Sequence, residues 1–455
     1  MNIAVIGGGL AGLAAACELV DLGHRPTIFE RRPWAGGKTY SYVDRETGDE
    51  VDNDQHVFMQ CTTAYTDFLR KLGTLGLCRR QRRLSVPVFN RDGSRSTLRA
   101  SGLPAPLHLG WSFLRYKHIA ASIKPGIART LLKAARMSEQ ERASLHERSL
   151  GDWLRENGQG GVAIRDFWDF MLVPTLNASS EESSAADALF VLREGFLRSN
   201  HTAAIGVARC GLTRLHVDPA VAYFTARGGS IRTGTTVTGL RVRDGRITGL
   251  RVEGAQEEDF DAVVCAVPPT QAASLLSQDG FDFSALRAIE MAPIINLHLW
   301  FDRPVADFSL AAFVGNELQW AFNRDRIDPG LPEGQKHRLV VSLSAASPYM
   351  GLTRKELRER FLPQLHRAIP GTAEARLVHF LAIKEPEATF VPSPGLHRPT
   401  TQTAWPDLVL AGTFTDTGWP ATMESAVRSG QAAARTLDEA LAPGPHQRAK
   451  NGCNR

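Results

Sequence analysis

The sequence predicts an α/β fold built on a parallel sheet, and three features of its pattern support this prediction. A β-branched run at residues 3–6 passes directly into an Ala- and Leu-rich helix pattern that ends at Gly23. A second strand pattern follows at residues 26–29. Two further apolar runs, at 260–267 and 408–411, have the composition of strands that are buried on both faces. We therefore expect the chain to leave this sheet and to return to it later. In between, the pattern predicts a helical stretch over residues 149–196 with a break at 176–180, and a strand over residues 377–383.

The glycine turn after the first strand has the spacing of a dinucleotide-binding βαβ unit. Gly7 permits the tight turn, Gly9 lets a pyrophosphate approach the backbone, and Gly12 lets the helix pack closely on the sheet. The helix N-terminus offers free N–H groups and a positive dipole end to the phosphates. Glu30 closes the unit, and its carboxylate can accept hydrogen bonds from both ribose hydroxyls while it repels a 2′-phosphate. FAD or NAD is therefore favoured over NADP.

A second glycine pair, Gly36-Gly37, comes shortly after this unit and is followed by Lys38. Such a pair permits a sharp backbone turn close to a ligand. Lys38 adds positive charge at the turn, so we interpret it as part of the nucleotide site. Without Glu30 just upstream, the same residues would be interpreted as a solvated basic turn.

Length and composition are those of a globular protein with two or more domains. The chain has 455 residues, of which 43% are hydrophobic and 22% charged, and its net charge of +5 does not favour nucleic acid as a partner. The six cysteines have neither CxxC nor metal-ligand spacing, so we expect no metal site and a cytoplasmic location. A strand pattern that begins next to Met1 leaves no room for a signal peptide. No apolar run approaches the roughly 20 residues that span a bilayer.

Residues 104–136 form a basic amphipathic stretch that carries six basic residues and no acidic one. Apolar residues, among them Leu107, Trp111 and Leu114, are interleaved with the basic ones. One interpretation is a helical surface that lies on a membrane, on its cytoplasmic face. The alternative is a solvated helical cap whose apolar face belongs to the core.

Four features taken together resemble a known group of flavoproteins: the glycine turn with Glu30, the Gly36-Gly37 pair, the hairpin that begins at Val237, and the strand–helix unit at Ala411-Gly412. Over nearly the whole chain they resemble the FAD-dependent amine oxidase and phytoene desaturase superfamily. Within it, the sequence is most similar to the squalene-associated desaturases, the hydroxysqualene dehydroxylases. This narrower resemblance rests on several short motifs: Asp52–His56, Phe167-Trp168, Leu176-Asn177, Gln319-Trp320, Lys384-Glu385, Ala388–Phe390 and Gly418–Ala426.

The resemblance implies a Rossmann-like FAD-binding domain of the GR2 type that is interleaved with an α+β substrate-binding domain. We expect residues 1–80, 205–290 and 395–442 to form the FAD-binding domain. Residues 81–204 and 291–394, which include the helical part 104–136, would form the substrate-binding domain. The polar segment 443–455 is predicted to be a disordered tail.

The resemblance also implies which residues hold FAD. Val237 would bind the adenine through its backbone, Gly412 would bring the last strand close to the flavin tail, and Gln55 would lie against the isoalloxazine ring. The helix after Pro420 would direct its positive end at the flavin edge that becomes negative on reduction. The expected cofactor-binding set is Gly7, Gly9, Gly12, Glu30, Gly36, Gly37, Lys38, Gln55, Val237, Gly412, Thr413, Ala421, Thr422 and Met423.

Two positions depart from the family pattern. Family members usually have Asp directly after the Ala-Gly of the last strand, where this chain has Thr413, so we expect an altered contact with FAD. Asp416 is a candidate to compensate. The family's loop usually has Gly where this chain has Asp54. The extra carboxylate beside the flavin would be either a catalytic group or a surface substitution.

The reaction that we favour is reductive dehydroxylation of hydroxysqualene to squalene by hydride transfer from reduced flavin. An acid must protonate the leaving hydroxyl, and His56 and Asp54 are the candidates; the alternative for His56 is a buried histidine bonded to the backbone. The reaction also needs an apolar tunnel whose π faces stabilise a cation. The expected substrate-pocket residues are Trp168, Phe170, Asn177, Asn296 and Trp320. Core packing is the alternative for the two tryptophans.

Three other functions are left open. A phytoene-type desaturase would remove hydride from an isoprenoid and would need no acid. An amine oxidase would carry a lysine at the position that corresponds to Asn296, so this activity is disfavoured. A non-catalytic flavoprotein is consistent with Thr413. Because the sequence contains only one dinucleotide-binding turn, we expect a separate reductase or NAD(P)H as the electron donor and a lipophilic isoprenoid as the substrate.

Overall fold

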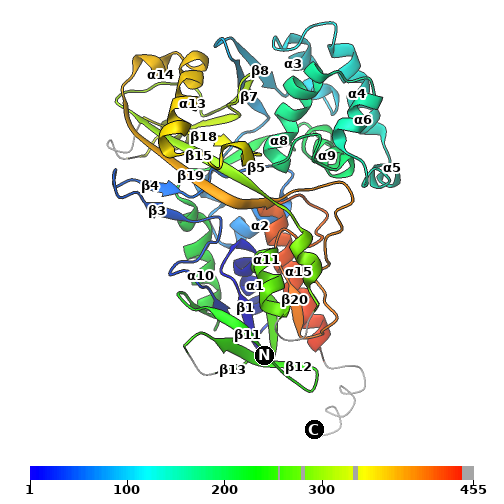
Figure 1. Ribbon diagram of the computed structural model, residues 1–455, viewed down its shortest axis with the longest axis vertical. Coiled ribbons are helices and arrows are strands. Elements are labelled where there is room, and N and C mark those ends of the chain that lie inside the picture. The colour runs from blue at the N-terminus through cyan, green and yellow to red at the C-terminus, as the bar shows by residue number, and fades with distance from the viewer. Residues whose placement is uncertain (255–256, 278–281, 332–336, 443–455) are drawn as a thin grey trace.

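The computed structural model describes residues 1–455 except 255–256, 278–281, 332–336 and 443–455. The predicted tail therefore lies outside the described residues. The chain forms two layers of structure one above the other, with a parallel sheet and its helices below and a mixed sheet beside a helical group above (Figure 1). The β-strands β15 and β19 pass from the upper part toward the lower one.

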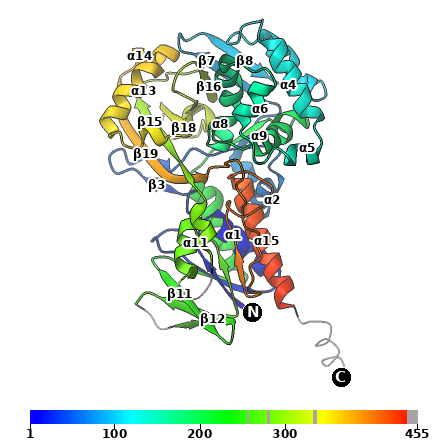
Figure 2. The ribbon, with the colours of Figure 1, turned by 45° about the vertical axis from the view of Figure 1, so that its right-hand side comes forward.

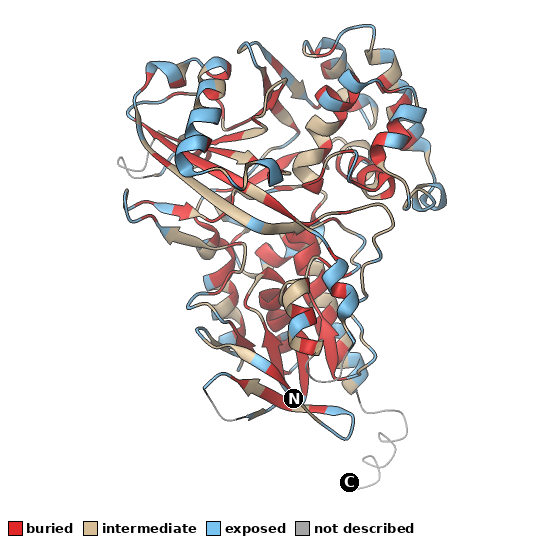
Figure 3. Ribbon diagram, viewed as in Figure 1, coloured by how far each residue is buried: buried red, intermediate tan, exposed pale blue. Residues whose placement is uncertain are grey.

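The lower part is built on a five-stranded parallel sheet whose strand order is β10-β2-β1-β14-β20. Every residue of β14 and β20 is buried, as expected for strands covered on both faces (Figure 3). The sheet draws its strands from three separate parts of the chain, so the predicted return to the sheet is confirmed. The strands are β1 (Asn2–Ile6), β2 (Arg25–Phe29), β10 (Ser230–Arg232), β14 (Ala262–Cys265) and β20 (Leu408–Leu410).

Two helices that are far apart in the sequence, α1 (Leu10–Asp21) and α15 (Met423–Leu441), pack against each other beside this sheet. Their close approach requires glycine, because a Cβ at Gly430 would lie 2.2 Å from the carbonyl oxygen of Ala11. A Cβ at Gly12 would lie 2.0 Å from the carbonyl oxygen of Gly7. The close packing at Gly12 was predicted from the sequence, whereas the close approach of the two helices at Gly430 was not.

Smaller elements surround the parallel sheet. The predicted hairpin is confirmed, since β11 (Val237–Arg243) and β12 (Arg246–Val252) pair around Asp244 and Gly245, both of which have positive φ. The remaining elements are β3 (Ser41–Val43), β4 (Glu50–Asp52), β5 (Val57–Met59), α2 (Thr63–Lys71), β6 (Cys78–Arg80), β9 (Ile205–Ala208), α10 (Asp218–Thr225), β13 (Glu258–Asp259) and α11 (Pro269–Leu276).

The upper part contains a seven-stranded mixed sheet whose strand order is β19-β15-β18-β17-β16-β7-β8. The pattern 377–383 predicted a strand there, but the observed β19 extends to Phe390 because its whole length pairs with β15. The strands are β7 (Ser85–Asn90), β8 (Arg95–Arg99), β15 (Met291–Phe301), β16 (Leu310–Val314), β17 (Trp320–Asn323), β18 (Arg338–Leu343) and β19 (Leu377–Phe390). The helices after β17 are α12 (Arg324–Ile327), α13 (Arg354–Ala368) and α14 (Gly371–Glu374).

The helical group lies beside this sheet (Figure 2). Its helices are α3 (Gly110–Arg115), α4 (Lys124–Arg136), α5 (Glu139–Ala143), α6 (Leu150–Glu156), α7 (Gly161–Ala163), α8 (Phe170–Leu176) and α9 (Ala185–Val191). Two π-helical segments, η3 (Ile164–Asp169) and η4 (Leu192–Leu197), interrupt the α-helical pattern. The predicted break after Leu176 is confirmed, because Asn177 ends α8 in the left-handed conformation at φ 53°.

Candidate functional site

A cavity of about 1210 Å³ lies at the carboxyl ends of the parallel strands, where they meet β15 and β19. Ligands of open α/β sheets bind at this edge. The volume exceeds the 300–1000 Å³ that is usual for a small-molecule site, so the cavity has room for a dinucleotide and a second molecule. Its walls come from the starts of α1, β11 and α15, from the loops 36–40 and 53–59, and from the end of β19.

The start of α1 forms one end of the cavity. Gly7 has a φ of +107°, and a Cβ there would lie 2.7 Å from the carbonyl oxygen of Ala266. Gly9 and Leu10 line the cavity at the helix N-terminus. The first turn carries no acidic residue and no side-chain cap, so its N–H groups are free to bind phosphate oxygens.

Glu30 lies at the end of β2 with its carboxylate buried at the wall of the cavity. Its Oε2 accepts a hydrogen bond from the Gly8 N–H at 2.8 Å, and its Oε1 accepts one from the Arg32 N–H at 2.9 Å. These bonds orient the carboxylate and leave each oxygen a further lone pair for a ribose hydroxyl. Val237 at the start of β11 also lines the cavity, two residues after Thr235, whose N–H donates to the Glu30 carbonyl oxygen at 2.9 Å.

The second glycine pair lies directly against the first turn. The Gly36 N–H donates to the carbonyl oxygen of Gly8 at 2.8 Å, and a Cβ at Gly37 would lie 2.9 Å from the Cα of Gly9. Both glycines of the pair have positive φ. Their lack of side chains is therefore what lets the two turns face the cavity together.

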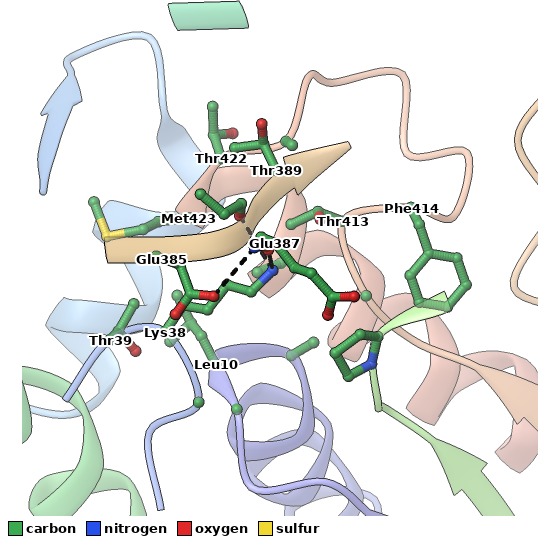
Figure 4. Close-up of a pocket in the computed structure, with 18 of the residues that line it drawn as sticks. Leu10, Lys38, Thr39, Glu385, Glu387, Thr389, Thr413, Phe414, Thr422 and Met423 are labelled. Carbon is green, nitrogen blue, oxygen red and sulfur yellow. Dashed lines mark hydrogen bonds between the residues drawn. The ribbon is translucent and has the colours of Figure 1, made fainter. Parts of the chain in front are cut away.

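Lys38 extends from this turn toward β19 and lies between the carboxylates of Glu385 and Glu387 (Figure 4). Its Nζ donates to the backbone carbonyls of Glu387 and Ala388. Burial lowers the pKa of Lys38, while the two glutamates act in the opposite direction. The ammonium group is the cationic group that the cavity offers to a phosphate from this turn.

The segment after β20 forms the opposite wall. Gly412 has a φ of +145°, and its N–H donates to the Ser429 hydroxyl at 2.9 Å, which ties it to α15. Thr413, Ala421, Thr422 and Met423 all line the cavity. The Thr422 hydroxyl accepts from the Ser425 N–H and so caps α15 as its N-terminus reaches the cavity.

Asp416 does not compensate for Thr413. It is absent from the cavity wall, and its carboxylate pairs with Arg398 at 3.2 Å on the surface. The Arg398 guanidinium also donates to the carbonyl oxygens of Thr415 and Trp419. Asp416 is therefore one of the contacts that hold this loop in place, because Arg398 draws its carboxylate away from the cavity.

The loop of Asp54, Gln55 and His56 lines the cavity beside β15. Asp54 is only 8% exposed, and its burial raises the pKa of the carboxyl group. The Asn296 side-chain amide donates to Asp54 Oδ1, and the His56 ring Nδ1 lies 3.1 Å from the Asp54 carbonyl oxygen. The interpretation of Asp54 as a surface substitution is therefore wrong, since Asp54 is buried in the wall of the cavity and bonded to Asn296.

The predicted substrate-pocket residues divide into two groups. Asn177 lines the cavity, and its side chain bonds to the Ala292 carbonyl oxygen at 3.1 Å and to the Thr389 hydroxyl at 2.9 Å. Asn296 stands behind the wall, where it holds the loop of Asp54.

The other three predicted pocket residues do not line this cavity. Trp168 is 0% exposed, and its indole N–H donates to Gln159 at 3.0 Å inside the helical core. Trp320 stacks on Phe322 in the mixed sheet, and Phe170 lines a smaller, separate cavity. The expectation that Trp168 and Trp320 line the substrate pocket is therefore wrong. Both rings pack against neighbouring side chains, Trp168 in the helical core and Trp320 in the mixed sheet.

The aromatic residues that do line the cavity were not assigned from the sequence. Phe190 and Trp419 make an edge-to-face contact at 5.3 Å, and both lie in its wall. Glu385, Glu387 and Thr389 were also not assigned, because the predicted strand ended before them. The motifs Lys384-Glu385 and Gly418–Ala426 were the available signals.

Within the described ranges, there is no group of three or more His, Cys, Asp or Glu side chains that could hold a metal ion. In the same part of the chain, every helix is too short or too polar to cross a bilayer.

The parallel sheet, the glycine turn and the oriented Glu30 carboxylate define a dinucleotide-binding protein of the Rossmann class. The model of the family "Flavin containing amine oxidoreductase" matches residues 10–438. The hydroxysqualene dehydroxylase of Rhodopseudomonas palustris is 30% identical over 97% of this chain and 99% of its own length. The 15-cis-phytoene desaturase of Synechococcus elongatus is 25% identical over 96% of each chain.

The fold agrees with solved structures. An oxidoreductase from Methanosarcina mazei superposes with a TM-score of 0.74 at 17% identity, and the match covers 96% of this chain and 100% of that one. The chain belongs to the flavin-containing amine oxidoreductase family. It is an FAD-dependent oxidoreductase, and the resemblance inferred from its sequence is confirmed.

Proposed function

We propose that this protein converts hydroxysqualene to squalene by reductive dehydroxylation. In the balanced reaction the C–O bond breaks, the hydroxyl group takes up a proton and leaves as water, and a C–H bond forms at the same carbon. FAD, once reduced and bound, supplies the two electrons and the hydrogen for that bond as hydride. The protein must supply the proton, a cavity free of water and the orientation of the substrate.

The buried carboxyl group of Asp54 is the observation that carries this proposal. Burial raises its pKa, so the group is held toward its protonated form at the wall of the cavity. His56 lies next to it with its ring at the same wall. A protonated carboxyl group at the cavity wall can donate its proton to a leaving hydroxyl group, so its position favours a reaction that consumes a proton. Neither desaturation nor amine oxidation needs such a donor.

The rest of the cavity suits a long isoprenoid. Apolar side chains contributed by several elements face it, among them Leu275, Ile294, Phe190 and Trp419. The aromatic faces can stabilise an allylic cation by cation–π attraction. Lys38, Glu30 and the glycine turns would hold the phosphate and ribose groups of FAD away from this apolar region. The names of the relatives, hydroxysqualene dehydroxylase and phytoene desaturase, support an isoprenoid substrate.

The test is turnover by flavin-loaded protein reduced with dithionite and supplied with hydroxysqualene in detergent, with the lipids analysed by mass spectrometry. We expect squalene from the wild type, and a loss in kcat of about 10²- to 10⁴-fold for Asp54→Asn. Asp307→Asn is the matched control, because this carboxylate is exposed and lies outside the cavity. Squalene formation at the wild-type rate by Asp54→Asn would remove the acid from the mechanism.

The second candidate, a desaturase, is favoured by the names of several relatives and by the apolar cavity. The same protein in its oxidised form would then convert a phytoene-like substrate to a more conjugated polyene. Amine oxidation is disfavoured by Asn296, which stands where a lysine is expected and is engaged with Asp54. Reduced flavin that hydroxysqualene does not reoxidise, together with oxidised flavin that a phytoene-like substrate does not reduce, would favour a non-catalytic protein.

We further propose that the substrate arrives from a lipid surface on the cytoplasmic face. Part of the stretch 104–136 belongs to the core, since Ile119 and Ile127 are buried. Another part is free to lie on a membrane, since Leu107, Trp111 and Leu114 are about 60% exposed. Arg115 lies over the Trp111 ring at 4.3 Å and adds positive charge beside the exposed apolar side chains. This combination suits an anionic membrane surface. A separate reductase or NAD(P)H would reduce the flavin.

A further inference from the structure

A second cavity of about 480 Å³ lies on the other side of α8. Buried apolar side chains of the mixed sheet form its floor, and Phe170 and Val173 of α8 form one wall. Arg91, Arg165, Asp166, Asp169, Asn316 and Gln319 contribute its polar lining. Nothing in the proposed reaction at the first cavity uses this space.

The two cavities adjoin each other. Pro174 in the middle of α8 lines both of them, with Val173 facing the second cavity and Thr175 the first. A proline has no backbone N–H, so it presents apolar surface at this junction with no donor to desolvate.

Hydrogen bonds also connect the two walls. Gln319 of the second cavity bonds to the Ser344 carbonyl oxygen at 2.9 Å and accepts from the Ser344 N–H at 2.7 Å. The next residue, Ala345, donates its N–H to the Asn177 side chain of the first cavity at 2.6 Å. One turn after β18 therefore fixes both walls relative to each other.

The lining of the second cavity separates into an apolar floor and a polar rim. Phe313, Val314 and Leu318 are at most 5% exposed and close the floor, whereas Phe170, Val173 and Pro174 of α8 are partly exposed and present the apolar surface that a ligand could contact. At the rim, the Arg165 guanidinium makes two bonds of 2.7 Å to the Asp166 carboxylate. Because the two side chains satisfy each other, neither needs a hydrogen bond from a ligand that enters past the rim.

The rim lies next to the exposed apolar residues of α3. Phe113 of α3 packs edge-to-face on Phe167 at 5.5 Å, and Phe167 belongs to the η3 segment that also supplies Arg165 and Asp166. A chain that enters at the rim would therefore come from the side of the protein that bears Trp111.

We propose that the second cavity binds the distal, unreacting end of a linear isoprenoid whose reacting end lies in the first cavity. This inference rests on the proposed function, because it requires a substrate too long for one cavity. The second site would discriminate by chain length, since each buried methylene adds to the binding free energy. A short prenyl alcohol would reach only the first cavity.

The first test uses the flavin-loaded protein and a squalene analogue with a diazirine at one terminus, followed by photolysis and peptide mapping. We expect labelling within 165–174 or 313–319, and its loss when excess squalene is added. Labelling confined to residues of the first cavity, or spread over the surface without enrichment in these segments, would overturn the proposal. Labelling there by a protein that makes no squalene would instead refute the proposed reaction alone.

The second test narrows the cavity with Val173→Trp and compares hydroxysqualene with a short allylic alcohol such as farnesol. We expect kcat/KM for hydroxysqualene to fall at least about tenfold, with the value for the short alcohol unchanged within about twofold. Val162→Trp is the matched control, because Val162 is exposed and lines neither cavity. Equal losses on both substrates, or none on either, with flavin content retained, would contradict the proposal.

Discussion

Asn296 and Asp54, which are 242 residues apart in the sequence, meet behind the wall of the large cavity, where the Asn296 amide donates to the Asp54 carboxylate. The other end of the same amide accepts a hydrogen bond from the Gln55 N–H at 3.4 Å. One side chain on β15 thus fixes two consecutive residues of the loop that carries both candidate acids. A lysine at this position could not make both contacts, because it has donors but no acceptor.

Asn296→Leu tests this relationship through the pH profile. The hydrogen bond from the Asn296 side chain favours the carboxylate form and lowers the pKa of Asp54. Without this hydrogen bond, the pKa of Asp54 moves further upward. We expect the alkaline limb of kcat/KM to shift to higher pH, with a loss of about 10- to 100-fold at the optimum from misplacement of the loop. Steady-state kinetics across the pH range provide the measurement. An unshifted limb would show that the titrating acid lies elsewhere.

Asp54→Asn should change the pH dependence of stability. Because burial raises the pKa of Asp54 in the folded protein, the stability linked to its protonated form is complete at low pH and is lost as pH rises through that pKa. The asparagine side chain of the variant does not ionise, so the variant does not lose this stability at high pH. We expect its Tm to exceed that of the wild type by on the order of 1–2 °C at about pH 8 and to match it at about pH 4. Thermal unfolding of the flavin-free proteins gives the comparison, and a constant offset at both pH values would contradict it.

Lys38→Met should weaken FAD binding. The ammonium group is the cation that the second glycine turn brings to the cavity, and a charge-assisted hydrogen bond to phosphate contributes about 1.5–3 kcal/mol. We expect the Kd for FAD to rise roughly 10- to 100-fold, measured by flavin fluorescence during titration. Lys38→Arg retains the charge and serves as the control. Unchanged affinity in the methionine variant would place Lys38 outside the cofactor site.

Gly430→Ala should separate α1 from α15. The added Cβ would lie 2.2 Å from the Ala11 carbonyl oxygen, so the two helices must move apart. We expect a loss of about 1–3 kcal/mol in the free energy of unfolding, measured by urea titration, together with weaker flavin retention. Gly160→Ala is the control, since no neighbouring atom lies within 4 Å of a Cβ there. Equal effects of both substitutions would mean that the helix contact is tolerant.

The double substitution Trp111→Ser and Leu114→Ser should reduce binding to vesicles that contain anionic lipid. Both side chains are about 60% exposed, so their removal costs the fold little but removes apolar area that would enter the bilayer. We expect a fall of at least about tenfold in the partition coefficient measured by co-sedimentation.

The control for this double substitution is a single substitution at another exposed apolar residue. Val378→Ser removes an equally exposed apolar side chain on the mixed sheet and should leave vesicle binding unchanged. Activity on detergent-solubilised substrate should be the same in all three proteins. A change from dimer to monomer in the double variant, without any effect on vesicles, would identify the surface as a contact between copies of this chain.

The nucleotide half of the site could be predicted because its signals are local. Gly7, Gly9 and Gly12 follow one strand within six residues, and a side chain at Gly7 or Gly12 would collide with neighbouring backbone atoms. The hairpin at Asp244-Gly245 is similarly local, since its turn needs positive φ at both residues.

The substrate half could be predicted only in part. Trp168 and Trp419 both occur in the short motifs that carry the narrower resemblance, and sequence pattern does not tell which ring faces a cavity and which packs in a core. The structure places the Trp168 ring against Gln159 in the core and Trp419 at the wall. The length of β19 was also underestimated, because pairing with β15 extends it through Glu385 and Glu387.

By itself, the sequence determined the parallel sheet, the glycine turns and the acid at the end of the second strand, and with them the dinucleotide cofactor. Only the tertiary structure decided that Asp54 is buried against Asn296, that Lys38 reaches β19, and that a second cavity adjoins the first across α8. The physical reason is the distance along the chain between the residues that interact. Backbone conformation is set by neighbouring residues, whereas the burial and pKa of a side chain depend on strands that the chain brings together from hundreds of residues away.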